Sequence, residues 1–259
     1  MTLLGPADPP AVHRINPDGR APILFVSDHD ANAVAAALDT LGLPPEELAR
    51  HVGYDIGIAH IARRLSARFD APLIASGYSR LVVDPNRWPG TAGSIPEAAD
   101  GTTIPGNRNL TDDARSARLD SLFHPYHAAI AETLDAMIAH GPAPLFIALH
   151  SFTPALRSAG GDRPWEIGFL WDTDDRASAL AIAAFRRRFP DVNVGANQPY
   201  SGSSPEGYTV PVHAKRRGLH DLTLEFRQDL IATPEGGDLW ADRFAVVLDD
   251  VLANSALIQ

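Results

Sequence analysis

The chain has 259 residues, is 45% hydrophobic, carries a formal net charge of −10 and contains no cysteine. This length can bury a sizeable core in one large α/β domain or two small ones, and without cysteine there can be no disulfide framework, thiol nucleophile or thiolate metal site. The acidic balance and the lack of a long basic run argue against duplex nucleic acid or an anionic membrane as a partner, so the expected partner is a small molecule.

The N-terminus lacks the basic-then-apolar pattern of a signal peptide, and no apolar run approaches the roughly 20 residues needed to cross a bilayer. We therefore expect a cytoplasmic, bacterial-type enzyme. Residues 1–20 are predicted to be a loosely packed N-terminal arm, and residues 21–259 a single domain. The sequence gives no indication of the oligomeric state.

Short apolar runs bounded by turn residues predict β-strands. Most of these runs are continuous rather than alternating, which suits central strands covered on both faces. In chain order the predicted strands are 23–27, 72–76, 80–84, 145–149, 167–171, 192–196 and 222–227.

Helical periodicity fills the gaps between these strands. Apolar stripes at helical spacing cover 58–65 and 244–251, and 115–140 and 178–189 also read as helices, with Pro125 starting or kinking the second half of its segment. Strands that alternate with helices predict an α/β layer structure with a mixed, mainly parallel sheet. The Pro/Gly-rich stretch 84–110 is unusually long for a connection and predicts a functional loop or lid.

Two histidines follow the ends of predicted strands: His29 after the first, and His150 after 145–149. Ligands of open α/β sheets bind outside the carboxyl ends of the strands, so both imidazoles are expected at one site. Imidazole with carboxylate suits zinc, and three protein ligands with an open position are typical of a catalytic site. For either histidine alone, a hydrogen-bonded core or surface position is the ordinary alternative.

The third ligand remains open among Asp55, Asp30 and Asn32. Asn32 stands three residues after His29, where an H-x-x-E hydrolase carries a carboxylate, and a neutral amide is a poor substitute. Asp55 is the preferred candidate, although it could equally be a charge at the start of a helix that faces the helix dipole.

Glu225 lies inside a predicted strand, and its neighbours Leu224 and Phe226 point to the opposite face. A carboxylate in a central strand is costly unless it is paired or needed. Beside a metal it would act as the general base that takes a proton from the attacking water and passes it to the leaving nitrogen. The alternative is an ion pair with Arg227 or Arg80.

Three side chains near one predicted strand end are candidates for binding an acidic substrate: Arg80, Asn86 and Arg87. Guanidinium groups bind carboxylates in a bidentate manner, and an amide adds a neutral donor. Structural salt bridges to Asp84 are the competing explanation. Asn197 and Tyr200 are weaker pocket candidates, because their loop consists of ordinary turn formers.

Several stretches together resemble a known family. They are "SDHDAN", "DIGIAHIARRLSARFDAPLIASGYSRLVVDPNR", "SIPEAADGTTIPGNRNL", "HSFTP", "RPWEIGFLW", "NQPYSG" and "LEFRQDL", in the family's order over roughly residues 23–232. On these motifs the chain resembles the N-formylglutamate amidohydrolase family. The resemblance implies a single-domain, phosphorylase/hydrolase-like fold of the zinc carboxypeptidase type, with a mixed sheet between helices.

The resemblance also implies site residues and a reaction. On this template His29 and His150 look like ligands of one Zn2+ per chain, Glu225 looks like the catalytic acid/base, and Arg80, Asn86 and Arg87 look like substrate binders. Asp55 as the third ligand and Arg80 as a second catalytic residue are expectations from the residues themselves. The implied reaction is hydrolysis of N-formyl-L-glutamate to formate and L-glutamate, in histidine catabolism. "SDHDAN" departs from the Pro-His-Ser-Gly run of the histidine-pathway enzymes. A carboxypeptidase-like or other acyl-amino-acid deacylase, and a non-catalytic carboxylate-binding protein, therefore remain alternatives.

Overall fold

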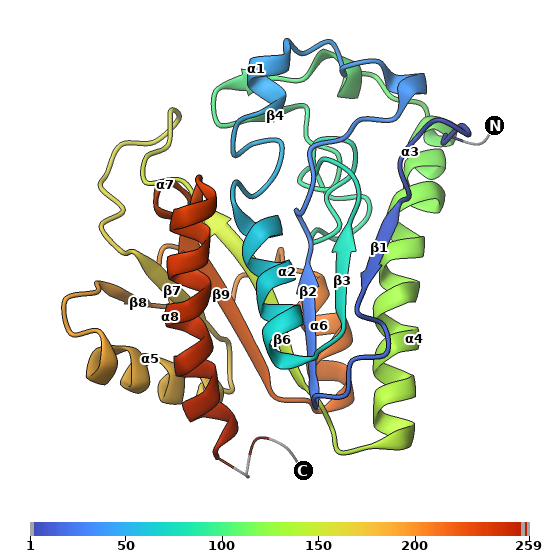
Figure 1. Ribbon diagram of the computed structural model, residues 1–259. Helices are drawn as coiled ribbons and strands as arrows, with labels where there is room; N and C mark the ends of the chain where they lie inside the picture. Colours follow the sequence, from blue (N-terminus) through green and yellow to red (C-terminus); the bar gives the residue numbers. More distant parts are fainter. Residues whose placement is uncertain (1–2, 255–256, 258–259) are drawn as a thin grey trace.

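The computed structural model describes residues 3–254 and 257, and in this part of the chain one seven-stranded sheet lies between two layers of helices (Figure 1). The sheet strands are β1 (Val12–Ile15), β2 (Ile23–Ser27), β3 (Leu73–Ser76), β6 (Leu145–Phe152), β7 (Ile167–Leu170), β8 (Val194–Ala196) and β9 (Asp221–Arg227), and a hairpin is formed by β4 (Ala98–Ala99) and β5 (Thr102–Thr103). The α-helices are α1 (Pro45–Leu48), α2 (Ile58–Phe69), α3 (Asp112–Arg118), α4 (His124–His140), α5 (Arg176–Arg188), α6 (Thr209–His213), α7 (Gln228–Ile231) and α8 (Pro234–Leu252). Short η turns cover Ala36–Leu38, Pro105–Asn107, Leu119–Phe123 and Lys215–Arg217.

The sheet has the order β1-β3-β2-β6-β9-β7-β8. Neighbouring strands run parallel except at the pairs β1–β3 and β7–β9, which are antiparallel. The prediction of a single-domain α/β fold with a mixed, mainly parallel sheet between helices is therefore confirmed.

Successive residues of the central strands enter different cores, as pleated strands require. In β2, Ile23 and Phe25 belong to the core with α2, α5 and α8, whereas Leu24 and Val26 belong to the core with α4. All eight residues of β6 are buried. Two buried faces explain why these strands read as continuous apolar runs.

The predicted strand 80–84 is wrong. Its backbone groups are satisfied by side chains instead of a sheet ladder: Leu81 O accepts from Asn107 at 2.8 Å, and Val82 O accepts from the buried Arg118 at 2.9 Å. Leu81 and Val82 pack in a third core that covers the carboxyl ends of the central strands. The burial of these apolar side chains was predicted correctly, but their pairing in a sheet was not.

Residues 12–15, within the predicted arm, form the edge strand β1, which pairs with β3. The helical segment predicted around Pro125 is continuous from Asp112 to His140 through a π turn, and Pro125 lies in the first turn of α4. Its missing N–H follows the π turn directly, where the regular helical hydrogen-bond ladder is already interrupted.

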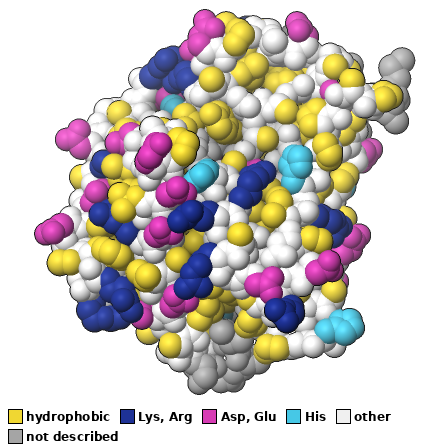
Figure 2. Space-filling view, in the orientation of Figure 1, with side chains coloured by type: hydrophobic (Ala, Val, Ile, Leu, Met, Phe, Trp, Pro, Cys, Tyr) yellow, Lys and Arg dark blue, Asp and Glu magenta, His cyan; other side chains and the backbone are white. Residues whose placement is uncertain are grey.

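The face formed by α2 and α8 carries interspersed basic and acidic side chains (Figure 2). Ion pairs such as Arg64–Asp242 at 2.8 Å and Arg68–Asp249 at 3.0 Å link the two helices. Among the described helices, none is long and apolar enough to cross a membrane.

Candidate active site

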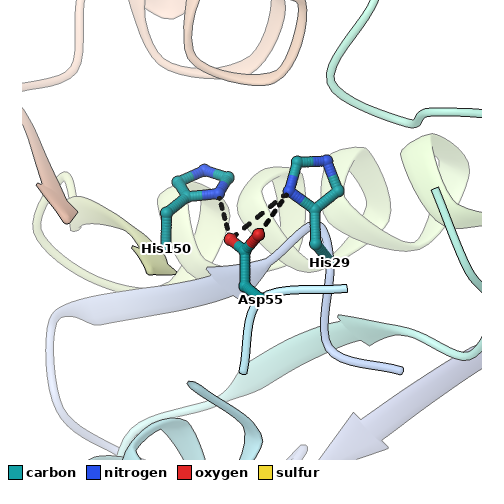
Figure 3. A group of neighbouring side chains, drawn as sticks. All are labelled: His29, Asp55 and His150. Atoms are coloured by element: carbon teal, nitrogen blue, oxygen red, sulfur yellow. Dashed lines mark hydrogen bonds and ion pairs between the residues drawn. The ribbon is translucent and has the colours of Figure 1, made fainter. Parts of the chain in front are cut away.

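His29, Asp55 and His150 come from three separate segments and converge at the carboxyl ends of the central strands (Figure 3). His29 lies two residues beyond β2, and His150 lies in β6, which pairs in parallel with β2. One possible ligand atom from each residue lies within 4.8 Å of the others, and all three residues are buried. The structure thus brings together the two predicted histidines and the preferred third candidate.

Asp55 is held in place by backbone contacts. Its N–H donates to His29 O at 3.0 Å, and its carboxylate accepts from the N–H of Ser151 at 3.1 Å. The helix α2 begins at Ile58 rather than at Asp55, because Gly57 adopts a left-handed conformation with φ of 82°. The Asp55 carboxylate therefore faces the two imidazoles and does not cap the helix.

Each imidazole lies between two carboxylates. His29 Nδ1 is 3.3 Å from Asp55 Oδ1, and its Nε2 is 2.9 Å from Asp84 Oδ1. His150 Nδ1 is 3.0 Å from Asp55 Oδ2, and its Nε2 is 3.3 Å from Asp28 Oδ2. Asp84 and Asp28 are the outer carboxylates of the cluster, and Asp55 is the inner one.

Proton counting shows what this arrangement requires. A carboxylate only accepts, so contacts with Asp84 and Asp28 place a proton on Nε2 of each imidazole. A neutral imidazole then directs the lone pair of Nδ1 at Asp55, which is also an acceptor. Either a second proton on each ring or a cation among these atoms relieves that conflict. Burial opposes the imidazolium, but the pKa of His29 is raised beside Asp84 and Asp55, and that of His150 is raised well above its ordinary value by bonds to Asp28 and Asp55.

The outer carboxylates are themselves fixed. Asp28 Oδ1 accepts from Tyr126 and Thr209, both at 2.9 Å, and Asp84 Oδ2 accepts from Arg80 Nε at 2.9 Å. Despite burial, which favours the neutral acid, contacts with His150 lower the pKa of Asp28, and Arg80 and His29 lower that of Asp84. Imidazoles oriented by carboxylates on the nitrogen away from the ligand position are typical of metal sites. The buried group of His29, Asp55 and His150 could therefore hold a metal ion.

Glu225 lies beside this cluster. It is directly opposite His150 in the β6–β9 register and is 7% exposed. Its Oε2 has no hydrogen-bond partner among the described residues, and burial raises its pKa to about 7. The alternative of an ion pair with Arg227 is not observed, because Arg227 pairs with Asp229 at 2.8 Å.

A cavity of about 330 Å³ opens onto these residues. The cavity is lined by the candidate metal ligands, by Glu225 and by four other predicted site residues: His29, Asp55, His150, Glu225, Arg80, Asn86, Arg87 and Tyr200. The long stretch 84–110 contributes Asn86 and Arg87, both from its first residues. Closure of the rest of this stretch over the cavity remains a prediction.

Four of the candidate residues have other contacts. The side-chain oxygen of Asn86 accepts from the N–H groups of Tyr208 and Thr209, and Asn197 lies outside the cavity lining, where its side-chain oxygen accepts from the N–H of Trp171. Asp30 pairs with Arg63 at 2.8 Å, and Asn32 is exposed. The structure does not bring Asp30 or Asn32 to the histidines.

Sequence reasoning missed part of the site. It did not identify Asp84 as the partner of His29 or Asp28 as the partner of His150. It also missed Thr223 and Asp221, which line the cavity on the same face of β9 as Glu225. The period of two along a strand is the signal that could have identified them.

Comparisons with known proteins identify similar chains. A family model described as N-formylglutamate amidohydrolase matches residues 21–232. The crystal structure of gene product Atu2144 from Agrobacterium tumefaciens is 30% identical, with a TM-score of 0.92 over 97% of this chain and 98% of that chain. The crystal structure of N-formylglutamate amidohydrolase from Ralstonia eutropha JMP134 is 18% identical, with a TM-score of 0.69 over 96% of this chain and 98% of that chain, and shares the fold. A comparison with curated proteins finds no match.

Proposed function

The chain belongs to the N-formylglutamate amidohydrolase family, and we therefore propose that it is a zinc-dependent hydrolase that cleaves the amide bond of an N-acyl amino acid. His29, Asp55 and His150 would hold the zinc ion, in line with the preference of zinc for imidazole and carboxylate. When bound, zinc supplies Lewis-acid chemistry that polarises a carbonyl and makes water more acidic. The family's reaction on N-formyl-L-glutamate, in histidine catabolism, serves as the reference reaction.

The single observation that carries this proposal is the unpartnered carboxylate of Glu225 beside the candidate metal ligands. A general base is most effective when its pKa lies near the working pH, and burial raises the pKa of Glu225 to about 7. Its Oε2 would take a proton from the attacking water and return that proton to the leaving nitrogen. A pure binding protein has no use for such a group next to two oriented imidazoles.

Two arginines supply positive charge to the cavity. Asp84 holds the Arg80 guanidinium through Nε and Nη2, and Nη1 lies 3.7 Å from Asp55. Arg80 would therefore act as a fixed charge that stabilises negative charge developing on the carbonyl oxygen. Arg87 donates to Asn86 O at 2.9 Å and is 4.0 Å from Glu206, so it is the less neutralised of the two. We assign the substrate carboxylate to Arg87.

Elemental analysis together with an amidase assay tests this proposal. Wild-type protein is expected to hold about one zinc per chain and to release formate from N-formyl amino acids, whereas His29→Ala and His150→Ala should lose both properties. Glu225→Gln should keep its zinc and lose at least about a hundredfold in kcat, the usual contribution of a positioned acid–base group. Loss of zinc in Glu225→Gln would make Glu225 a ligand, and full activity after chelation would contradict the mechanism.

The same assay addresses the two alternatives. Turnover of acetyl or succinyl amides but not of formyl amides would favour another acyl-amino-acid deacylase. Binding of N-acyl amino acids without any turnover, in zinc-loaded protein, would favour the non-catalytic carboxylate-binding protein.

A further inference from the structure

The cavity extends along β9 away from the metal ligands. Glu225, Thr223 and Asp221 occupy alternate positions on this strand and all line the cavity. With a rise of about 3.3 Å per residue, the Cα atoms of Glu225 and Asp221 lie about 13 Å apart. The Asp221 end of the cavity, called here the distal end, is therefore far from the reacting bond.

The distal end contains a carboxylate without a fixed partner. Asp221 is 8% exposed, and its carboxylate makes no side-chain hydrogen bond or ion pair within the described part of the chain. Burial raises its pKa to about 6, although the positive charge of Lys215 acts in the opposite direction. In β9 such a carboxylate is costly unless a ligand completes it.

The other charged groups at the distal end neutralise each other. Lys215 Nζ donates to Asp172 Oδ2 at 2.7 Å, and both residues line the cavity. Leu170 pairs with Thr223 across the antiparallel β7–β9 register, so the chain that follows, Trp171 and Asp172, runs alongside the Asp221 end of β9. Lys215 is thus engaged by Asp172, and the Asp221 carboxylate is left without an ion pair of its own.

We propose that the distal end selects an N-acyl amino acid whose side chain ends in a cation, of the length of lysine or arginine. This inference rests on the proposed function, because it assumes that the acyl carbonyl sits at the candidate metal ligands and the carboxylate at Arg87. From the acyl carbon to the side-chain end, lysine spans seven bonds and arginine eight, roughly 8 to 10 Å at about 1.2 Å per bond. A hydrogen bond of about 3 Å then reaches Asp221.

A glutamate side chain fits the distal end less well. It is shorter than lysine and does not reach Asp221, and its carboxylate would point towards a carboxylate of the same charge. The only cation at the distal end among the described residues, Lys215, already donates to Asp172. Like charges in a desolvated site are strongly disfavoured.

Nα-formyl-L-lysine and Nα-formyl-L-norleucine form the sharpest substrate pair, because they differ only by the terminal ammonium. For zinc-loaded wild-type protein we expect kcat/KM to be at least tenfold higher for the lysine compound, and higher than for N-formyl-L-glutamate. In Asp221→Asn the lysine and norleucine values should come within about threefold of each other. Asp229→Asn, an equal charge change outside the cavity, should keep the wild-type ratio.

Folding does not obscure this test. Replacing a buried carboxylate that has no hydrogen-bond partner among the described residues by an amide should leave the melting temperature unchanged or higher, which thermal unfolding of Asp221→Asn checks. A lysine preference that survives in Asp221→Asn would overturn the inference. A preference for N-formyl-L-glutamate would also overturn it, and would indicate that Lys215 binds the substrate side chain.

Binding measurements separate this inference from the proposed function. If no N-formyl amino acid is hydrolysed, calorimetric titration of the same lysine and norleucine compounds into zinc-loaded protein still measures the selection. If the lysine compound binds more tightly and this preference is lost in Asp221→Asn, selection at the distal end is supported even though the hydrolase proposal has failed. Equal binding of both compounds would overturn the inference by itself.

Discussion

At the residue scale, the defining feature is the number of carboxylates around two imidazoles. Asp55 contacts both rings on one side, and Asp84 and Asp28 contact them separately on the other. A surface histidine pair has no need of three buried acids, whose desolvation is costly. The arrangement orients both rings for a shared ligand.

The outer carboxylate Asp84 gives a test of this view. Asp84→Asn should keep the shape of the site but weaken its hold on the His29 ring, and zinc affinity should fall about 10- to 100-fold, as is usual when such a partner is changed. Competition with a chromophoric chelator measures the affinity. Asp30→Asn, another buried acid near His29 that contacts Arg63 instead, is the control, and an equal loss of affinity in both variants would contradict the assigned role.

At the element scale, a pair of histidines joins helices α4 and α6 beside the site. His127 in α4 and His213 in α6 stack with ring centroids 5.1 Å apart, and His127 Nε2 donates to Pro85 O at 2.9 Å, directly after Asp84. With that proton placed, His213 Nε2 donates to His127 Nδ1 at 2.9 Å, and both rings are neutral. The pair links two helices to the loop that carries Asp84.

This pair predicts a pH dependence of stability. Burial lowers the pKa of His127 to about 4 and that of His213 to about 3, below the ordinary value near 6.5 of an unfolded chain. At a pH between the folded and the unfolded pKa, the unfolded state binds more protons than the folded state. The free energy of unfolding therefore decreases as the pH falls through this range. Each histidine should contribute a loss on the order of 2 kcal/mol between pH 7 and pH 5.

Denaturant unfolding at both pH values measures this loss. His213→Gln retains a donor towards His127 but removes one titrating group, so the loss between pH 7 and pH 5 should be smaller than in wild type by on the order of 2 kcal/mol. The exposed His140→Gln is the control and should behave as wild type. An unchanged pH dependence in His213→Gln would show that the pair does not cause it.

The start of α2 gives a second prediction at this scale. A Cβ at Gly57 would lie 2.2 Å from Ile231 O, at a φ of 82° that side chains rarely adopt. Gly90 has a similar φ of 84° but no atom within 4 Å of the added Cβ. Gly90→Ala should therefore cost about 1 to 2 kcal/mol from strain alone, and Gly57→Ala about 3 kcal/mol or more from strain and clash.

Chemical denaturation compares these two variants. Zinc affinity should fall in Gly57→Ala only, because the shifted segment carries Asp55 two residues earlier. Equal stability losses would mean that the contact with Ile231 is relieved at no cost.

At the scale of the whole molecule, the candidate ligands join parts of the chain that are far apart in sequence. One residue each comes from the segment after β2, the segment before α2 and the end of β6. Strands β2 and β6 are neighbours in the sheet, and α2 packs against both of them (Figure 1). A metal bound there would stabilise the native chain, because the unfolded chain has no preformed site.

Thermal unfolding with and without zinc measures this stabilisation. At free zinc a hundredfold above its dissociation constant, linkage predicts about 3 kcal/mol and a melting temperature roughly 6 to 12 °C higher than for the metal-free protein. His150→Ala should show no zinc-dependent shift. A shift of wild-type size in that variant would place the zinc at another site.

The sequence by itself determined the elements that carry the site. Continuous apolar runs predicted β2 and β6, and the polar residues directly after or within them predicted His29 and His150 as neighbours. Glu225 was identified because a carboxylate in an apolar strand is unusual. These features depend on periodicity within one element, which the sequence records directly.

Only the tertiary structure decided how the site is completed. Strand order, register and loop path place Asp55, rather than Asp30, beside both histidines. They also pair Asp84 with His29 and Asp28 with His150, and they bring Asp221 to the cavity. The strand predicted at 80–84 failed for the same reason, since side chains of Asn107 and Arg118 replaced a sheet neighbour. Contacts between distant segments arise from packing, and no local pattern in the sequence encodes them.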